Sequence, residues 1–431
     1  MTTPLEIWGG HECTVHRVGA EWRDQTRLSG HHDRPDDLDL FARLGLRALR
    51  YPVLWERTEL APGVYDWRWA DTRLERLQAL GVRPILGLVH HGSGPAWTNL
   101  LDPAFPEGLA RFAGAVAERY PWVRDWIPVN EPLTTARFSA LYGRWYPHAR
   151  NEGQFWLAVT HQLEGVRAAM QAIRAVAPDA RLIQTEDFGR SWGTGPCAEQ
   201  ARHENIRRLF TWDVLTGRFT REHPLHDRLG EFWLATRLGS FVRAPCPPDV
   251  IGVNHQVTSD RVLDHRLERY PRQLHGGNGK VAYADVEAGK VVKNLPDSWL
   301  GALSLLWDRY RIPIAVTECR LGCPPDQQVR WLEACWRAAI QARRAGVEVV
   351  AITPWALLGS HDWDSLLTSA EGRYEPGVFD VSSGRPRPTE LAALVRELAF
   401  DGAPARPSAP LETWWTGPAG MVRGRASRRG R

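Results

Sequence analysis

The sequence lacks several features that would assign it to whole classes of protein. Its six cysteines form no Cys-x-x-Cys pair and no zinc-ligand spacing, so a structural zinc site is not expected. No run of about 18 apolar residues occurs, so no membrane-spanning helix is expected. The N-terminal segment has no basic stretch followed by an apolar run. We therefore expect no signal peptide, and a cytoplasmic location with reduced thiols.

An excess of one charge is also missing from most of the chain. The formal net charge is +4, and the segment 401–431, with six arginines and two acids, carries +4 by itself. Residues 1–400 are therefore neutral overall, which does not favour a nucleic-acid-binding body. The Pro/Gly/Arg-rich segment 401–431 is interpreted as a C-terminal extension, with binding to anionic partners as the less favoured alternative.

Tryptophan, in contrast, is abundant, with 21 of 431 residues. One interpretation is additional aromatic packing in the core. The other is sugar binding, because the apolar face of a pyranose packs on an aromatic ring.

Short apolar runs alternate with amphipathic helical patterns along the chain. Eight runs read as strands buried on both faces: 5–10, 46–53, 83–89, 124–129, 181–186, 249–254, 313–317 and 348–354. Eight parallel strands with no antiparallel pairing close most simply into a single-domain (β/α)8 TIM barrel, predicted over residues 1–400. The alternative is an open doubly wound sheet, which would usually carry a glycine-rich phosphate loop after its first strand; residues 9–13, GGHEC, are not one.

Two regions are longer than a minimal barrel needs. Residues 187–248 contain their own helical pattern, and residues 256–295 hold all three lysines, Lys280, Lys290 and Lys293. Long insertions after barrel strands build substrate walls. A solvated hairpin without a role is an equally supported interpretation of the lysine-bearing segment.

Polar and aromatic residues stand at the predicted strand ends, where barrel enzymes carry their chemistry. In chain order they are His11 and Glu12, Arg50 and Trp55, His90 and His91, Asn130 and Glu131, Glu186 and Asp187, Asn254 and His255, Glu318, and Trp355. Two of the carboxylates, Glu131 and Glu318, directly follow apolar strands that lie across the barrel from each other. Cleavage of a glycosidic bond needs such a pair, one acid to protonate the leaving oxygen and one carboxylate at C1. The alternative, two ordinary loop carboxylates, is much less favoured for the pair than for either residue alone.

An ordered set of motifs resembles family 1 of the glycoside hydrolases, the β-glucosidase-like retaining enzymes of clan A. The matching segments, in family order, are RALRYPVLWER (47–57), PILGLVHH (84–91), WIPVNEP (126–132), IGVNH (251–255), IAVTECR (314–320), WALLGSHDW (355–363) and YEPGVFD (374–380). Each match is weak alone, but together they span about residues 5–400. The resemblance is to a short, divergent member.

The resemblance implies a role for each matching residue. Glu131 would be the general acid/base, and Glu318 the nucleophile that forms a covalent glycosyl-enzyme. Arg50 would keep Glu318 ionised by lowering its pKa, whereas burial and the charge of Glu318 would raise the pKa of Glu131. Asn130 would bind the sugar 2-hydroxyl. The remaining predicted substrate-binding residues are His90, His91, Asn254, His255, Trp355, His361, Trp363 and Glu12, with His11 as an alternative to Glu12.

Several departures from the family pattern leave alternatives open. Cys319-Arg320 stands where Asn-Gly is usual, and His255 replaces a tyrosine, although it could still donate to Glu318. The sequence thus predicts a retaining β-glycosidase, with a transglycosidase or a catalytically silent sugar-binding protein as alternatives. A metal site at His11, His90, His91 and Glu12 is disfavoured because HxH and HExxH spacings are absent. We expect a carbohydrate substrate, no cofactor, no metal, no nucleic acid and no membrane partner; the sequence leaves the oligomeric state open.

Overall fold

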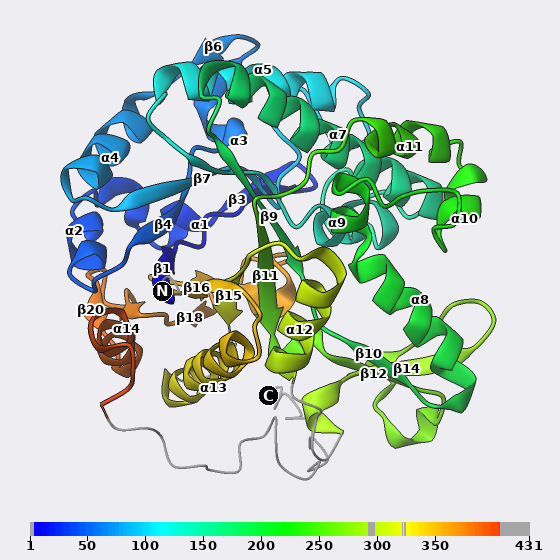
Figure 1. The fold of residues 1–431 in the computed structure, drawn as a ribbon. Helices are drawn as coiled ribbons and strands as arrows, with labels where there is room; N and C mark the ends of the chain where they lie inside the picture. The colour runs from blue at the N-terminus through cyan, green and yellow to red at the C-terminus, as the bar shows by residue number, and fades with distance from the viewer. Residues whose placement is uncertain (1–3, 292–297, 321, 323–324, 406–431) are drawn as a thin grey trace, which may run out of the picture.

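A computed structural model describes residues 4–291, 298–320, 322 and 325–405. Its centre is a closed barrel of eight parallel strands (Figure 1). The barrel strands are β1 (Glu6–Gly10), β4 (Ala48–Pro52), β7 (Arg83–His90), β8 (Asp125–Asn130), β9 (Arg181–Asp187), β11 (Val250–Gln256), β15 (Ile314–Arg320) and β16 (Val349–Pro354). Each of the eight predicted strand segments overlaps one of them. The predicted (β/α)8 barrel is confirmed, and the open sheet is excluded because β1 pairs with both β4 and β16.

Helices surround the barrel, as Figure 1 shows. The helices between and after the strands are α1 (Gln25–Leu28), α2 (Asp37–Ala42), α3 (Trp55–Thr58), α4 (Arg68–Ala79), α5 (Phe105–Arg119), α6 (Pro132–Ala136), α7 (Glu152–Val176), α8 (Ala198–Arg208), α9 (Phe210–Leu215), α10 (His226–Gly230), α11 (Ala235–Arg243), α12 (Ser298–Tyr310), α13 (Pro325–Arg344) and α14 (Glu390–Asp401). None of the helices in the described part of the chain combines the length and apolarity that crossing a bilayer requires.

The barrel strands are buried on both faces, which explains their continuous apolar runs. Inside the barrel, one residue from each strand forms a separate buried cluster: Trp8, Ala48, Ile85, Ile127, Ile183, Val250, Ala315 and Ala351. These residues lie toward the N-terminal halves of their strands and fill the barrel interior, as side-chain layers do in TIM barrels. The polar strand-end residues therefore lie at the opposite, C-terminal rim.

The long insertions form structure beside the barrel. Residues 187–248 contain α8 to α11, and residues 256–295 contribute most of a four-stranded sheet, which Figure 1 shows next to α8. Its strands are β10 (Ser191–Gly193), β12 (Arg261–Asp264), β13 (His275–Gly277) and β14 (Ala282–Glu287). Antiparallel pairing occurs here, within the lysine-bearing segment for which a hairpin was one of the two interpretations. Lys280 is exposed, whereas Lys293 and residues 406–431 of the predicted extension lie outside the described residues.

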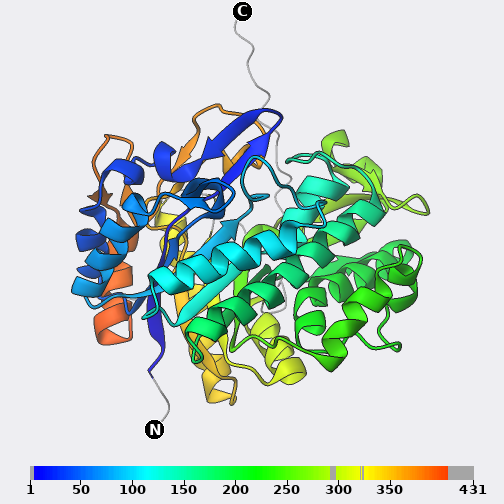
Figure 2. The same ribbon diagram turned by 90° about the horizontal axis from the view of Figure 1, so that it is seen from above.

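Four further strand pairs are short and lie outside the barrel. They are β2 (Val15–Val18) with β3 (Glu21–Asp24), β5 (Glu59–Ala61) with β6 (Val64–Tyr65), β17 (Ser360–His361) with β18 (Tyr374–Glu375), and β19 (Phe379–Asp380) with β20 (Arg387–Pro388). The β2–β3 hairpin lies beside the loop after β16 (Figure 2), where the Gln25 amide bonds both backbone groups of His361. Loops that follow β1 and β16 therefore meet at the rim of the barrel.

A buried carboxylate joins three strands at the N-terminal end of the barrel. Asp125 opens β8, is fully buried, and accepts hydrogen bonds of 2.8 Å from Arg83 Nε and of 2.8 Å from Arg181 Nε. We expect Asp125→Ala to lower the free energy of unfolding by about 2–3 kcal/mol, because two guanidinium groups lose their charged acceptor. Urea unfolding monitored by circular dichroism measures this. The exposed Asp227→Ala is the matched control, and equal stabilities of the two variants would contradict the expectation.

Candidate active site

The C-terminal ends of the barrel strands bring most of the predicted site residues together. Arg50 lies in β4, His90 ends β7, Asn130 ends β8, Asn254 lies in β11 and Glu318 in β15. All five side chains are buried. Because parallel strands end at the same rim, residues far apart in the sequence share one pocket.

Hydrogen bonds connect the two predicted catalytic carboxylates into one network. Arg50 donates from Nη1 to Glu318 Oε1 (2.9 Å) and from Nη2 to Asn130 Oδ1 (2.8 Å). Asn254 donates from Nδ2 to Glu131 Oε1 (2.6 Å) and to Asn130 Oδ1 (3.3 Å). Arg50 therefore holds Glu318 and Asn254 holds Glu131, and Asn130 connects the two because it accepts from both.

The local backbone explains how Glu131 reaches this pocket. It directly follows β8 and adopts the left-handed region, with φ of 45° and ψ of 63°. Helix α6 starts at the next residue, Pro132, a residue type favoured at a first helical position. A non-glycine residue in the left-handed region is strained, and such strain is typical of functional sites. The sharp turn lets the carboxyl group meet Asn254.

A β-bulge positions Glu318 in the same way. Val253 pairs with Val316, but the next residue of β11, Asn254, pairs with Glu318, so that Thr317 is extra on β15. Bulges re-aim side chains and are frequent next to active sites. The Thr317 hydroxyl donates to Asn254 Oδ1 (2.7 Å), and its carbonyl accepts from Arg50 (2.6 Å). The additional residue thus orients both polar neighbours of the carboxylates.

The two carboxyl groups experience different electrostatic surroundings. Burial and then the charge of Glu318 raise the pKa of Glu131 well above its usual value. Burial also raises the pKa of Glu318 to about 7, although Arg50 acts to lower it. The sequence expectation for Glu131 agrees with this direction. The expectation that Arg50 keeps the pKa of Glu318 low is wrong, because desolvation outweighs the ion pair. Since only Glu318 has a cation partner, Glu131 is the stronger proton holder.

An aromatic wall stands next to Glu318. The His90 ring stacks on Trp355 with centroids 5.6 Å apart and planes 6° apart. The Trp355 indole donates to Glu12 Oε2 (3.1 Å), and the Arg50 guanidinium lies 4.5 Å from its ring centroid. His90 Nε2 is buried without a hydrogen-bond partner. Because buried polar atoms are normally paired, this nitrogen is available to a bound hydroxyl group.

A second polar wall contains His91 and Trp363. His91 Nε2 lies 3.3 Å from Asn130 Nδ2, and its Nδ1 lies 3.0 Å from the Thr135 hydroxyl. Because the asparagine amide donates to Nε2, the imidazole proton is on Nδ1. Trp363 meets His91 edge-on at 5.6 Å, and its indole nitrogen is buried without a partner. The wall therefore offers an unpaired N–H donor.

The structure corrects the prediction for His255. Side chains alternate along a strand, so Asn254 faces the pocket and His255 faces the surrounding helices. His255 Nδ1 lies 2.6 Å from the Phe188 carbonyl, and its ring packs between Trp299 and Trp331. It makes no hydrogen bond to Glu318, so a substitute for the strand-6 tyrosine is not found at this position.

Three other predicted neighbours of the pocket have distinct positions. Cys319 shares the outward row of His255 and lies beside Cys335. Arg320 reaches the pocket wall, 5.4 Å from the Trp363 ring centroid, and forms an ion pair with Glu375. The His361 ring packs against Tyr374 at 4.8 Å, and within the described residues no hydrogen bond joins it to Glu131 or Glu318.

Sequence reasoning missed His16, which lies in the β2–β3 hairpin. Its buried ring contacts Trp145 at 5.2 Å, and the backbone of Leu367 lies within hydrogen-bonding reach of it. Burial lowers the pKa of His16 to about 3, so its imidazole is neutral near pH 7. His91, which also contacts Trp145 at 5.4 Å, places His16 on the same side of the pocket. The β2–β3 hairpin is short, and its sequence has no hydrophobic periodicity that would have indicated a position for His16 near the pocket.

The site has no cluster that resembles a metal centre. In the chain as far as it is described, no three His, Cys, Asp or Glu side chains come together in a way that could hold a metal ion. His11 packs instead against His31 at 4.5 Å, and His31 is bonded to Asp37 (2.9 Å).

The chain is similar to known proteins in sequence and in fold. No protein-family model matches the sequence. The chain is 23% identical to a 6-phospho-beta-glucosidase of Dickeya chrysanthemi over 383 residues, covering 82% of this chain and 80% of that protein. It is 21% identical to a phospho-cellobiase of Klebsiella oxytoca over 391 residues, covering 82% and 81%.

The fold has the same likeness. A family 1 β-glucosidase from Thermotoga maritima superposes with a TM-score of 0.68 at 18% identity, covering 86% of each chain. The same enzyme in complex with glucoimidazole gives a TM-score of 0.71 at 17% identity, covering 86% of this chain and 87% of that one. The predicted resemblance to the β-glucosidase-like family 1 glycoside hydrolases is therefore confirmed.

Proposed function

We propose that the protein is a retaining β-glycosidase that removes a terminal β-linked sugar. The observation that carries the proposal is the pair Glu131 and Glu318, buried in one hydrogen-bonded network in which only Glu318 has a cation partner. A paired acid and carboxylate is what glycosidic cleavage requires. The names of the sequence relatives, β-glucosidases and phospho-β-glucosidases, support the same reaction class.

In the first step, Glu131 donates its proton to the leaving oxygen while the Glu318 carboxylate attacks C1, so that the C1–O bond breaks as the C1–Oε bond forms. Glu318 loses its negative charge when it becomes an ester. The pKa of Glu131 then falls, because this charge was one of the two main effects that raised it. Glu131, now ionised, takes a proton from water in the second step, and the water oxygen displaces Glu318 from C1. Two inversions leave the β configuration unchanged.

We propose that the aromatic and polar walls hold the sugar. His90 and Trp363 present unpaired nitrogens and His16 a buried imidazole, whereas Glu12 offers carboxylate oxygens and Trp355 an apolar face. Asn130, fixed by Arg50 and by the Thr185 hydroxyl (2.8 Å), is suited to the 2-hydroxyl. In this proposal His91 orients Asn130, and His361 contributes through the position of its loop rather than through its ring.

The charges of the pocket favour an unphosphorylated sugar. Arg50 is paired with Glu318, and Arg320 with Glu375, so neither guanidinium is free for a phosphate. We expect kcat/KM for 4-nitrophenyl β-D-glucoside to exceed that for its 6-phosphate at least tenfold. A preference for the 6-phosphate would reject this part of the proposal while leaving the reaction class intact.

The silent sugar-binding alternative loses its main support. It was favoured by His255 and by Cys319-Arg320, but His255 and Cys319 face away from the pocket.

The anomer released first tests the proposal. ¹H NMR during hydrolysis of the aryl glucoside should show β-glucose as the first sugar product. First appearance of the α-anomer would reject retention, and no turnover of aryl β-glycosides of any common sugar would reject the hydrolase.

The pH profile should report the two carboxyl groups. Glu318 must be ionised, and its pKa is raised to about 7, so kcat/KM is expected to fall as the pH drops below about 7. Glu131 must be protonated, so the alkaline limb lies at higher pH.

In Arg50→Met the acid limb should move to higher pH, because the cation that stabilises ionised Glu318 is gone. We expect kcat/KM of this variant to fall about 100-fold.

Arg76→Met, at an exposed surface pair with Asp39, is the matched control and should leave both limbs in place. An acid limb near the ordinary carboxyl pKa in the parent protein, or one that does not move in Arg50→Met, would contradict this account of the site.

A further inference from the structure

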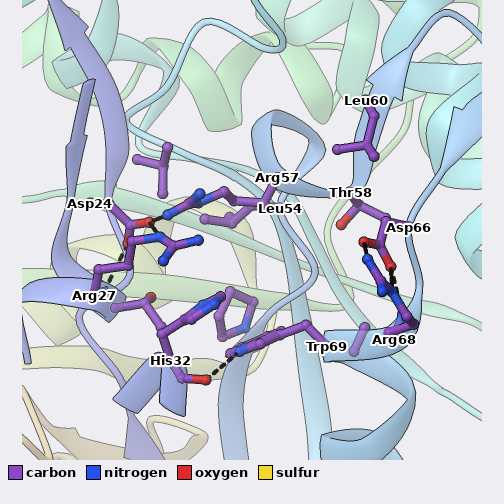
Figure 3. A pocket seen from close by; sticks show the side chains of 14 residues that line it. Asp24, Arg27, His32, Leu54, Arg57, Thr58, Leu60, Asp66, Arg68 and Trp69 are labelled. Atoms are coloured by element: carbon purple, nitrogen blue, oxygen red, sulfur yellow. Dashed lines mark hydrogen bonds and ion pairs between the residues drawn. The ribbon is translucent and has the colours of Figure 1, made fainter. Parts of the chain in front are cut away.

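A groove beside the barrel mouth is not used by the proposed reaction. It consists of two adjoining pockets of about 530 and 430 Å³, which share Val15, Asp24 and Arg57 among their lining residues. We call it the hairpin groove, because the β2–β3 hairpin forms one wall and α3 with β5 the other (Figure 3). None of the residues assigned above to the catalytic pocket lines it. Its volume is in the range of small-molecule sites.

Exposed tryptophans distinguish this groove from the rest of the surface. Trp22 and Trp97 line the second pocket and are 41% and 42% exposed. Among the described residues, the only other tryptophan counted as exposed is Trp233, which lies far along the chain between α10 and α11. At the other end, Trp69 lines the first pocket and stacks on His32, with centroids 6.1 Å apart and planes 11° apart. The groove thus accounts for part of the tryptophan excess that packing does not explain.

The polar groups of the groove are paired acids and bases. Figure 3 shows Asp24 bonded to Arg27 and Arg57, and Asp66 bonded to Arg68. Such pairs offer fixed donors and acceptors side by side with little net charge. They match the hydroxyl groups of a neutral sugar better than they match an anion, because each guanidinium already contacts a carboxylate, Asp24 serving both Arg27 and Arg57.

One buried acceptor is left without a partner. Glu56 lines the second pocket, and its Oε1 accepts from the Gly94 amide (2.9 Å), but its Oε2 is shielded from water and has no hydrogen bond. An unpaired buried oxygen is costly, and a ligand hydroxyl would satisfy it. Glu56 lies six residues beyond Arg50, in helix α3 after β4, and takes no part in the catalytic network.

We propose that the hairpin groove is a second carbohydrate-binding site, which takes a neutral oligosaccharide. Trp22 and Trp97 would pack on the apolar faces of its sugar rings, and the paired acids and bases with Glu56 would bind its hydroxyl groups. The inference goes beyond the proposed reaction, because it concerns a site with a lining of its own. Such a site would keep a longer glycan near the barrel mouth between catalytic events.

The experiment follows the tryptophans directly. The Glu318→Gln full-length chain is labelled with 5-fluorotryptophan, so that no saccharide is consumed. The ¹⁹F signals of Trp22, Trp97 and Trp233 are assigned by single tryptophan-to-phenylalanine changes. Cellotetraose, laminaritetraose, maltotetraose and inorganic phosphate are then titrated separately. We expect at least one tetrasaccharide to shift the Trp22 and Trp97 signals in a saturable way, and to leave Trp233 unchanged.

Affinity and activity provide the second measurement. Trp97→Ala should weaken the binding of that tetrasaccharide about tenfold, as measured from the shift of the Trp22 signal. The matched control Trp233→Ala should leave the affinity unchanged. Trp97→Ala in the otherwise unchanged chain should hydrolyse 4-nitrophenyl β-D-glucoside within twofold of the parent. That assay reports the proposed reaction independently of the groove.

Two results would overturn the proposal. In the first, none of the saccharides shifts the signals of the groove tryptophans, whether or not inorganic phosphate does. In the second, Trp97→Ala leaves the affinity for the tetrasaccharide unchanged.

Discussion

Replacement of Glu318 by alanine is expected to lower kcat for 4-nitrophenyl β-D-glucoside by about 10⁵-fold, as removal of the nucleophile of a covalent mechanism does. The change also creates space beside C1 and leaves Arg50 without its carboxylate. Sodium azide should therefore restore turnover, because the small anion can occupy this space and attack C1 directly. A single inversion then gives the α-glucosyl azide, which ¹³C NMR identifies.

The control for this variant is a buried carboxylate at the other end of the barrel. Asp125→Ala loses stability but should keep kcat within about twofold at temperatures where it is folded. Turnover near the parent level in Glu318→Ala, or a β-glucosyl azide as its product, would show that Glu318 is not the nucleophile.

Replacement of Glu131 by glutamine should have an effect that depends on the leaving group. Glutamine keeps an oxygen that can accept from Asn254, but it has no acidic proton to donate. We expect kcat/KM to fall about 10⁴-fold for methyl β-D-glucoside, which needs protonation of its leaving oxygen, and much less for 4-nitrophenyl β-D-glucoside. The alkaline limb of the pH profile should disappear. Azide should accelerate the second step and give the β-glucosyl azide.

Glu186→Gln is the matched control for this variant. Glu186 is also buried, and its carboxylate accepts a hydrogen bond of 2.9 Å from the backbone amide of Leu133, which lies two residues after Glu131. It should keep the parent's ratio of activities toward the two glucosides. Equal losses on both glucosides in Glu131→Gln would contradict an acid role, and so would a retained alkaline limb.

The barrel could be predicted from the sequence because each of its strands is buried on both faces. Segments such as Ile314 to Val316 read as continuous apolar runs, and each is followed by an amphipathic helix. The side sheet could not be predicted in the same way. Its first strand, at Ser191, pairs with Arg261, 70 residues further along, and three-residue strands have no periodic signal.

The candidate site was predictable where a side chain directly follows an apolar strand, as for Asn130 and Glu131. The prediction for His255 was wrong because neighbouring side chains of a strand point to opposite faces, so Asn254 and His255 do not both face the pocket. The raised pKa of Glu318 was also missed, since the sequence shows the charge of Arg50 but not the depth of burial.

Labelling with 2-deoxy-2-fluoro-β-D-glucosyl fluoride tests the central claim most directly. The fluorine slows both steps, and fluoride is a good enough leaving group for the first to proceed, so the glycosyl-enzyme accumulates. We expect intact-mass spectrometry to show one 2-fluoroglucosyl group per chain, and peptide mapping to place it on Glu318. Attachment to any other residue, or no label at concentrations that support turnover of the aryl glucoside, would contradict the account.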